Sequence, residues 1–317
     1  MTRVLLLGGA GQLGRCLQDR WPRDWERYAP ASDQLDIRDG AAVDRAVGRL
    51  RPDLVINAAA YNRVDEAERS PAEARAVNTV GAGNVARAAA RARARLIHIS
   101  TDYVFDGLRD GLPATRPYSE DDIPHPLNAY GESKRGGELA VLAEAPGAIV
   151  LRTAWLFSEY GHNFVRTVLR LAREGQPLRV VDDQVGSPTY AGDLAQAIVR
   201  LGAVCAGRGE ATGGIYHYSG VEAMSWHRFA DRIVRAARAS RVALSGRRAD
   251  QAARPYSSGP VAITSVSSAE YASPARRPCY SVLSCDKIHA FDIRQAPLAE
   301  GLTQVLRHET APQGNTE

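Results

Sequence analysis

A tyrosine and a lysine four positions apart are the residues best suited to proton chemistry. Tyr130 and Lys134 lie in "NAYGESKRGGE" (128–138), and residues at i and i+4 share one face of a helix. A positive charge about 4 Å from a phenol favours the phenolate by about 4 kcal/mol and lowers the phenol pKa by about three units. The pair therefore predicts a general acid, Tyr130, whose pKa is lowered by Lys134. The same spacing also occurs in exposed helices without function, so the context of the pair matters.

A threonine at the predicted end of a strand supplies that context. The stretch "STDYVFDG" (100–107) follows the apolar run "RLIHI" (95–99), and ligands of open α/β sheets bind at the carboxyl ends of strands. A hydroxyl there can hydrogen-bond a carbonyl oxygen and share the charge that develops on it. We therefore expect Thr101 to polarise a substrate carbonyl group that Tyr130 protonates.

A glycine-rich turn predicts a dinucleotide cofactor. The stretch "GGAGQLG" (8–14) follows the first apolar run and has glycines at positions 8, 11 and 14. This spacing is typical of a tight turn that brings the backbone and a helix N-terminus close to a pyrophosphate. An ordinary tight turn is the alternative. Lys134 is then also expected to hold the ribose hydroxyls of the nicotinamide half.

The end of the second predicted strand bears on the choice of cofactor. The expected position of an acid that binds the adenosine ribose is occupied by Ala29 to Ser32, so a 2′-phosphate would not be repelled. NADPH is expected, and NADH remains possible because Asp33 lies nearby. Asp36 is expected either near the adenine or as a helix N-cap.

The elements that position these residues alternate between strand and helix patterns. Short apolar runs at 3–8, 52–60, 95–100 and 148–155 are separated by helical patterns, which predicts an α/β fold with a doubly wound parallel sheet of the Rossmann type. We expect a dinucleotide-binding domain over 1–165 and a smaller, interleaved α/β substrate-binding domain over 166–317. A segment near 190–240 is expected to pack back on the first domain.

Composition excludes several other classes of protein. The net charge is only +4, from 40 basic and 36 acidic residues, and no basic stripe is interleaved with aromatic residues, so a nucleic-acid partner is not expected. No run approaches the roughly 18 apolar residues of a membrane span, and the N-terminus has no signal-peptide core. The four cysteines lack metal-like spacing. A cytoplasmic protein with reduced thiols is therefore expected.

Together these stretches resemble the dTDP-4-dehydrorhamnose reductase family of the extended short-chain dehydrogenase/reductase superfamily. The resemblance runs over nearly the whole chain. The glycine turn and the Tyr130–Lys134 pair are common to the superfamily. More specific to the family are "VVDDQVGSPTYAGDLA" (180–195) and "ASPARRPCYSVLS" (272–284).

The resemblance implies roles for individual residues. Tyr130, Lys134 and Thr101 would be catalytic. The sugar nucleotide would contact Thr101, Asp102, Tyr103, Trp155, Asn163 and Arg277. The cofactor would contact Gly8, Gly11, Gln12, Leu13, Gly14, Asp36, Ile37, Ala59, Ala60, Tyr61, Tyr130 and Lys134.

Some of these assignments have simpler alternatives. Trp155 can be a core aromatic and Asn163 a helix N-cap. Arg276 and Arg277, candidates for contact with the diphosphate or thymine, can be surface residues of a proline-rich loop. Some members of the family form a magnesium-linked dimer through glutamates, but Cys16 and Asp193 occupy the corresponding neighbourhoods here. We therefore expect no metal, and a monomer or weak homodimer.

The expected reaction is NAD(P)H-dependent reduction of the C4 ketone of a dTDP-4-keto-6-deoxyhexose, with dTDP-4-dehydro-L-rhamnose as the first choice of substrate. One alternative is another dTDP-4-keto-6-deoxy sugar of a natural-product pathway. The other is a regulatory subunit that binds a nucleotide without catalysis, although such a subunit has no need for a tuned phenol.

Overall fold

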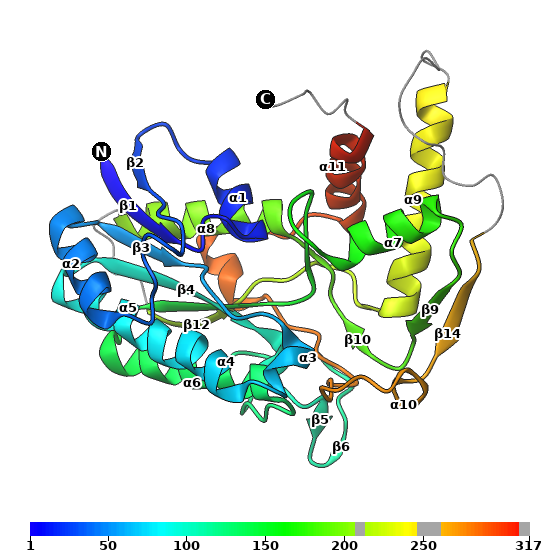
Figure 1. Ribbon diagram of the computed structural model, residues 1–317, viewed down its shortest axis with the longest axis horizontal. Helices are drawn as coiled ribbons and strands as arrows, with labels where there is room; N and C mark the ends of the chain where they lie inside the picture. Colours follow the sequence, from blue (N-terminus) through cyan, green and yellow to red (C-terminus); the bar gives the residue numbers. More distant parts are fainter. Residues whose placement is uncertain (207–212, 246–260, 311–317) are drawn as a thin grey trace.

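The computed structural model describes residues 1–206, 213–245 and 261–310 (Figure 1). Residues 207–212, 246–260 and 311–317, which belong to the predicted substrate-binding domain, lie outside the described residues. Within the described part, no helix is both long and apolar enough to cross a membrane.

A six-stranded parallel sheet forms the centre of the molecule, in the order β12-β7-β4-β3-β1-β2. The predicted doubly wound α/β fold is confirmed. The order reverses between β1 and β3, which is where ligands bind in such sheets. The strands are β1 (Thr2–Leu7), β2 (Trp25–Tyr28), β3 (Leu54–Asn57), β4 (Arg95–Thr101), β7 (Ile149–Thr153) and β12 (Gly214–His217).

Helices cover both faces of this sheet, because the strands are apolar on both sides. In β1, Val4 and Leu6 pack on one face and Leu5 and Leu7 on the other, as the alternation of side chains along a strand requires. One face is covered by α1 (Gln12–Asp19) and α8 (Ala191–Ala206). The opposite face is covered by α2 (Gly40–Leu50), α5 (Ala82–Arg91) and α6 (Ala129–Glu144) (Figure 1).

Late segments of the chain complete the sheet that the early segments begin. β12 pairs with β7, and Leu194, Ile198 and Leu201 of α8 pack in the same core cluster as Leu13 and Leu17 of α1. The division into two domains stays a prediction, since the chain crosses between its two parts more than once.

A smaller lobe has its own apolar cluster, which includes Val165, Leu169, Phe229 and Leu302. Its strands form two-stranded sheets. The sheet of β9 and β14 and the helices α7 and α9 lie together at one end of the molecule in Figure 1. The elements of this lobe are α7 (Phe164–Arg173), β9 (Leu178–Val181), α9 (Trp226–Ser245), β14 (Ile263–Val266), α10 (Ser268–Tyr271) and α11 (Leu298–Thr310).

One segment connects the lobe to the end of β4. Tyr118 and Leu283 form a parallel bridge, and so do Val185 and Tyr280. The backbone N–H of Ser281 donates to the carbonyl oxygen of Val185 at 2.8 Å. These contacts join the "PARRPCYSVLS" stretch (274–284) to Tyr118 and Val185, and Ser281 Oγ donates to Asp102, the residue after β4.

Candidate active site

The glycine turn is shaped by close backbone contacts. Gly8 has φ +79°, a conformation that other residues rarely adopt. A Cβ atom on Gly14 would lie 2.2 Å from the carbonyl oxygen of Gly8, so only glycine allows α1 to start so close to β1. Gly11 is exposed and is the N-cap of α1, with no side chain to cap the helix. The first-turn N–H groups of α1 are therefore suited to a pyrophosphate.

The loop after β3 lies against this turn. A Cβ atom on Gly8 would meet the backbone of Ala58 and Ala59 at 2.6 Å, so the ends of β1 and β3 meet at the point where the strand order reverses. Ala60 is exposed beside them. Tyr61 is buried, and its backbone N–H and C=O both bond to the side chain of Asn78, at 2.8 and 2.9 Å.

Asn78 was not singled out from the sequence. It lies in a π-helical turn (Ala76–Gly81), and its Nδ2 also donates to Ser133 Oγ on α6 at 2.9 Å. Ser133 Oγ in turn donates to the carbonyl oxygen of Tyr130. Such turns often occur at functional sites. This turn fixes the loop of Tyr61 relative to α6. The only sequence signal for this contact is an asparagine within a helical pattern.

Four of the residues that were expected to contact the cofactor make contacts with other residues of the protein. Leu13 and Ile37 are core residues, and Ile37 packs against Gly81. Asp36 forms a partly exposed ion pair with Arg38 at 2.6 Å, which lowers the pKa of the carboxyl group. Gln12 Oε1 accepts hydrogen bonds from the side chains of Asn163 and Ser158. Their roles toward a cofactor stay predictions.

The three residues expected to be catalytic meet at the end of β4. Asn128 caps α6 by accepting from the N–H of Gly131 at 2.8 Å, and the next turns carry Tyr130 and Lys134. Lys134 is buried, and its Nζ donates to the carbonyl oxygen of Ile99 at 2.6 Å. Thr101 ends the same strand and lies beside the phenol of Tyr130.

Burial decides how the groups at this site titrate. It raises the pKa of Tyr130 to about 12; the charge of Asp102 acts in the same direction, and the nearby Thr101 hydroxyl opposes it. The expected lowering of the Tyr130 pKa is therefore wrong for this structure, because burial raises the pKa of the phenol more than the nearby Thr101 hydroxyl lowers it. Burial also lowers the pKa of Lys134 to about 8, although Glu138 opposes the change.

The residues that follow Thr101 connect the site to the segment 274–284. Asp102 is 2% exposed and accepts from Thr101 Oγ1 at 3.2 Å and from Ser281 Oγ at 2.6 Å. Tyr103 packs edge-on against Tyr130, with ring centroids 5.9 Å apart, and lies close to Arg277. Arg277 forms a half-buried ion pair with Asp65 at 2.9 Å, whereas Arg276 is exposed.

Trp155 lies just beyond β7 in a strained backbone conformation, with φ +44°. Its ring stacks on that of Trp226, with centroids 3.5 Å apart and planes 6° apart, and it is only half-buried. A strained backbone at the rim of a site is typical of residues that position ligands. Trp226 gave no signal in the sequence.

Asn163 is the N-cap of α7 and accepts from the N–H of Arg166 at 3.1 Å. Its amide donates to Gln12 Oε1 at 3.0 Å and to the carbonyl oxygen of Ser158 at 2.8 Å. The capping alternative therefore describes what Asn163 does in this structure, and a contact with substrate stays a prediction.

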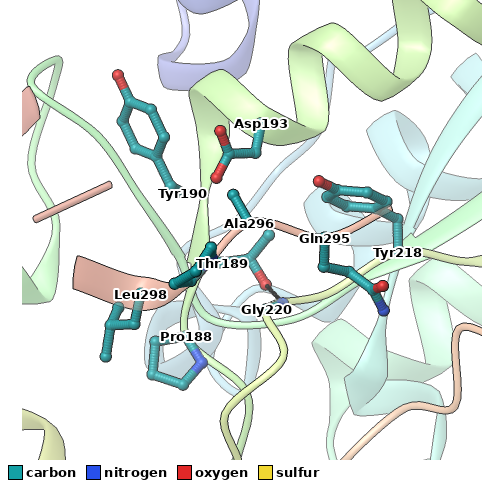
Figure 2. A pocket seen from close by; sticks show the side chains of 10 residues that line it. Pro188, Thr189, Tyr190, Asp193, Tyr218, Gly220, Gln295, Ala296 and Leu298 are labelled. Carbon is teal, nitrogen blue, oxygen red and sulfur yellow. Dashed lines mark hydrogen bonds between the residues drawn. The ribbon is translucent and has the colours of Figure 1, made fainter. Parts of the chain in front are cut away.

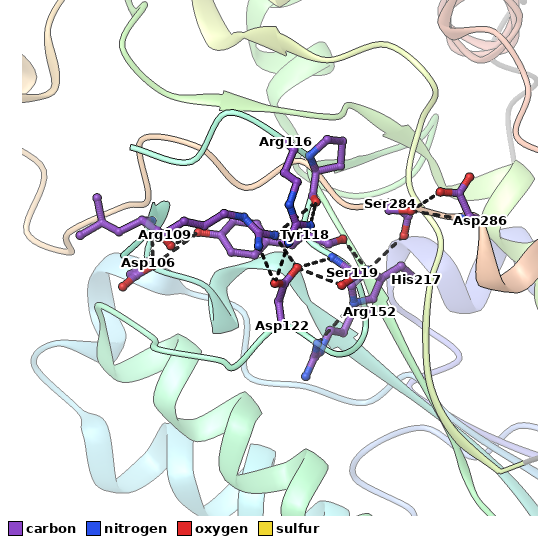
Figure 3. Close-up of polar contacts among 12 residues, drawn as sticks. Asp106, Arg109, Arg116, Tyr118, Ser119, Asp122, Arg152, His217, Ser284 and Asp286 are labelled. Atoms are coloured by element: carbon purple, nitrogen blue, oxygen red, sulfur yellow. Dashed lines mark hydrogen bonds and ion pairs between the residues drawn. The ribbon is translucent and has the colours of Figure 1, made fainter. Parts of the chain in front are cut away.

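A buried network of charged side chains contacts Ser100 near the end of β4. Arg152 and Glu138 have fully buried side chains and form an ion pair at 2.7 Å. Glu138 also accepts from Ser100 Oγ at 2.7 Å. Arg152 contacts His217, whose other ring nitrogen faces the carbonyl oxygens of Tyr118 and Ser284 (Figure 3). An arginine inside an apolar strand was the signal that could have revealed this network.

A pocket lies apart from these residues and contains none of the predicted site residues. It is lined by Thr189, Tyr190, Asp193, Tyr218, Gln295 and Leu298 among others (Figure 2). Burial raises the pKa of Asp193 to about 6, and Cys16 is fully buried. In the described part of the chain, no three His, Cys, Asp or Glu side chains are grouped to hold a metal ion.

Comparisons with known proteins show which family this chain is similar to. The family described as "RmlD substrate binding domain" matches residues 1–311. The chain is 38% identical to the dTDP-4-dehydrorhamnose reductase of Aggregatibacter actinomycetemcomitans, over 96% of this chain and 98% of that protein. It is 37% identical to a probable dTDP-4,6-dihydroxy-2-methyloxan-3-one 4-ketoreductase of Streptomyces antibioticus, over 98% of both chains.

A solved structure is similar over almost its whole length. The dTDP-4-dehydrorhamnose reductase of Bacillus anthracis in complex with NADP superimposes with a TM-score of 0.82 and is 35% identical in sequence. The match covers 96% of this chain and 99% of that one.

Proposed function

Because the chain belongs to the RmlD substrate binding domain family, we propose that it is an NAD(P)H-dependent oxidoreductase that reduces the C4 ketone of dTDP-4-dehydro-L-rhamnose to dTDP-L-rhamnose. The observation that carries this proposal is the meeting of Thr101, Tyr130 and Lys134 at the carboxyl end of β4. The reductases of A. actinomycetemcomitans and B. anthracis support the choice of substrate and cofactor.

The residues of the glycine turn fit a dinucleotide. The close approach of Gly14 to Gly8 and the bare N-terminus of α1 leave backbone donors where a pyrophosphate is bound in this fold. Ala59 and Ala60 offer small side chains next to this turn. NADPH, when bound, supplies the hydride for the ketone carbon.

Tyr130 is suited to deliver the proton. With its pKa raised to about 12, the phenol keeps its proton at neutral pH, which a general acid must do before the reaction. Thr101 lies beside the phenol and stabilises the charge that develops on the ketone oxygen. Lys134, anchored to the strand end, holds positive charge near the same point and lowers the energy of the phenolate left behind.

We infer that Arg277, Tyr103 and Trp155 bind the sugar nucleotide. Arg277 lies beyond Tyr103, which packs against Tyr130, and a guanidinium can bind a diphosphate through two hydrogen bonds. Trp155 follows β7, the strand next to β4, so its ring is close to the end of the strand that carries Thr101.

A second candidate has a specific observation in its favour. The probable 4-ketoreductase of S. antibioticus, named for a different dTDP-linked keto sugar, is nearly as similar as the dTDP-4-dehydrorhamnose reductases. A non-catalytic subunit is less well supported, because Thr101, Tyr130 and Lys134 are all present and adjacent. We also propose a cytoplasmic location, which four free cysteines support. We propose a monomer or weak homodimer because Cys16 and Asp193 stand in the neighbourhoods of the glutamates that link some relatives through magnesium.

The test is to incubate the purified chain with NADPH and dTDP-4-dehydro-L-rhamnose while following nicotinamide absorbance and identifying the product. Oxidation of NADPH with formation of dTDP-L-rhamnose is expected. Oxidation only with a different dTDP-4-keto sugar would favour the second candidate, and no oxidation with any of them would favour a non-catalytic subunit.

A further inference from the structure

The hydrogen count at Thr101 presents a problem for the reaction proposed above. A threonine hydroxyl has one hydrogen to donate and two lone pairs to accept with. In the structure Thr101 Oγ1 donates that hydrogen to Asp102 Oδ1 at 3.2 Å and accepts from the backbone N–H of Tyr103 at 3.2 Å. With Asp102 ionised, Thr101 has no hydrogen left for a ketone oxygen.

A proton on Asp102 removes this conflict. If Oδ1 carries a hydrogen, it donates to Thr101 Oγ1, whose two lone pairs are then filled by Asp102 and the N–H of Tyr103. The single hydrogen of Thr101 is released and is free to turn toward the phenol of Tyr130, which lies beside it, and toward a ketone oxygen bound there. Oδ2 continues to accept from Ser281 in both protonation states.

We propose that Asp102, held by Ser281, is a positioning residue that acts in its protonated form to turn the Thr101 hydroxyl toward the substrate ketone. The proposal rests on the function proposed above. It assigns to Ser281 a role in setting the state of Asp102, and it gives Asp102 a task other than contact with the sugar.

The surroundings of Asp102 favour the protonated form. Its side chain is 2% exposed and that of Ser281 is 1% exposed, and burial raises the pKa of Asp102 to about 7 against the hydrogen bonds from Ser281 and Thr101. The titratable groups that face it are Tyr103 in the same turn and Tyr130 on α6. Both phenols stay neutral, because burial raises their pKa values further.

Ser281 is well fixed for this role. Its backbone N–H donates to Val185, while the neighbouring backbone groups of Val282 and Ser284 bond to Tyr118 at 2.8 and 2.7 Å. Tyr118 and Ser284 belong to the polar network of Figure 3, which also includes His217. Backbone hydrogen bonds on both sides of Ser281 therefore fix its position beside Asp102.

The test compares pH profiles of kcat/KM for NADPH-dependent reduction. In the wild type, kcat/KM should fall about tenfold per pH unit above neutrality as Asp102 ionises. In Asp102→Asn this decrease in kcat/KM should be absent, because an amide donates to Thr101 at every pH. Only the decrease at higher pH, where Lys134 loses its proton, should remain. Ser281→Ala should move the decrease in kcat/KM to higher pH, since the carboxylate loses a stabilising donor.

Asp106→Asn is the matched control. Asp106 is a nearby carboxylate that contacts Leu108 and Tyr118, and its replacement should leave the wild-type pH profile unchanged.

A second measurement does not depend on the substrate. The carboxyl carbon signal of Asp102 in ¹³C-aspartate-labelled protein, assigned by its loss in Asp102→Asn, should titrate near pH 7. In Ser281→Ala it should titrate at a higher pH.

An unchanged pH profile in Asp102→Asn, or a carboxyl group that is ionised down to about pH 4, would overturn the inference. Failure of the proposed function would look different: the wild type would oxidise no NADPH with any dTDP-4-keto sugar, while the NMR titration would still decide the state of Asp102.

Discussion

Lys134 Nζ lies 2.6 Å from the carbonyl oxygen of Ile99, the third-last residue of β4. This contact joins the helix that carries Tyr130 to the strand that ends in Thr101. It explains how a buried ammonium is retained at the site, because a backbone carbonyl oxygen and the nearby Glu138 replace part of its lost hydration. The position of the charge is thus set by the strand as well as by the i, i+4 spacing.

Replacement of this lysine should stabilise the protein while impairing catalysis. The difference between the ordinary pKa of 10.5 and about 8 in the fold corresponds to about 3 kcal/mol, partly offset in Lys134→Met by the unpaired Ile99 oxygen, at about 1–2 kcal/mol. Lys134→Met should therefore raise the free energy of unfolding at pH 7 by about 1–2 kcal/mol and lower kcat. Chemical denaturation and steady-state kinetics measure the two effects.

The pH dependence of stability gives a check on the same residue. Between about pH 8 and 10.5 the unfolded chain keeps a proton on Lys134 that the folded chain has lost, so this lysine makes stability rise with pH in that window. The rise should be smaller in Lys134→Met. If wild type and variant have parallel stability curves over this range, the lysine is not buried as described.

The glycines of the turn should differ in what they do. In Gly14→Ala the new Cβ atom would lie 2.2 Å from the Gly8 oxygen, whereas in Gly11→Ala the nearest atom would be at 3.4 Å. We expect Gly14→Ala to unfold at lower temperature, and Gly11→Ala to fold normally but bind NADPH more weakly. Thermal melts and cofactor titration distinguish them. Gly48→Ala, on a helix with open space around it, is the control: it should not lower the melting temperature, because alanine favours a helix over glycine, and it should leave NADPH binding unchanged.

The buried ion pair should be needed for stability. Glu138→Gln leaves the fully buried Arg152 without a counter-charge, and breaking such a pair costs about 3–5 kcal/mol. Leu139→Ala, at the exposed neighbouring position, should cost far less. Equal stabilities of the two variants would contradict the network described here.

The sequence predicted those parts of the site that depend on local spacing. The glycines at 8, 11 and 14, the Tyr130–Lys134 face and the strand end at Thr101 each follow from a few adjacent residues. Contacts between distant residues gave no such signal: Ser281 and Asp102 are 179 positions apart, and Gln12 and Asn163 are 151 apart. The stacking of Trp226 on Trp155 and the pairing of β12 with β7 depend in the same way on how the chain folds back.

The prediction of a lowered Tyr130 pKa is wrong for a different physical reason. The sequence shows a lysine on the same helix face as the phenol, but not that the phenol loses water in the fold, which is the largest influence on its pKa. A pattern of residues shows which groups are near each other more reliably than it shows how much water surrounds them.

The two arginines of the proline-rich loop should also differ. Arg277 is partly buried and lies beside Tyr103, while Arg276 is exposed. Arg277→Lys should raise KM for the sugar nucleotide about tenfold or more with a smaller effect on kcat, because a lysine cannot make the paired hydrogen bonds of a guanidinium. Arg276→Lys is the matched control. A similar KM in both variants would remove Arg277 from the binding site.

The most direct test of the central claim is the rate of NADPH oxidation in a single turnover, measured for wild type and for Tyr130→Phe with the cofactor and a dTDP-4-keto-6-deoxyhexose both bound. Since only the proton donor is removed, we predict a rate about 10²–10⁴ times lower in the variant, with an unchanged dissociation constant for NADPH. A Tyr130→Phe variant that turns over at nearly the wild-type rate would show that the phenol does not deliver the proton.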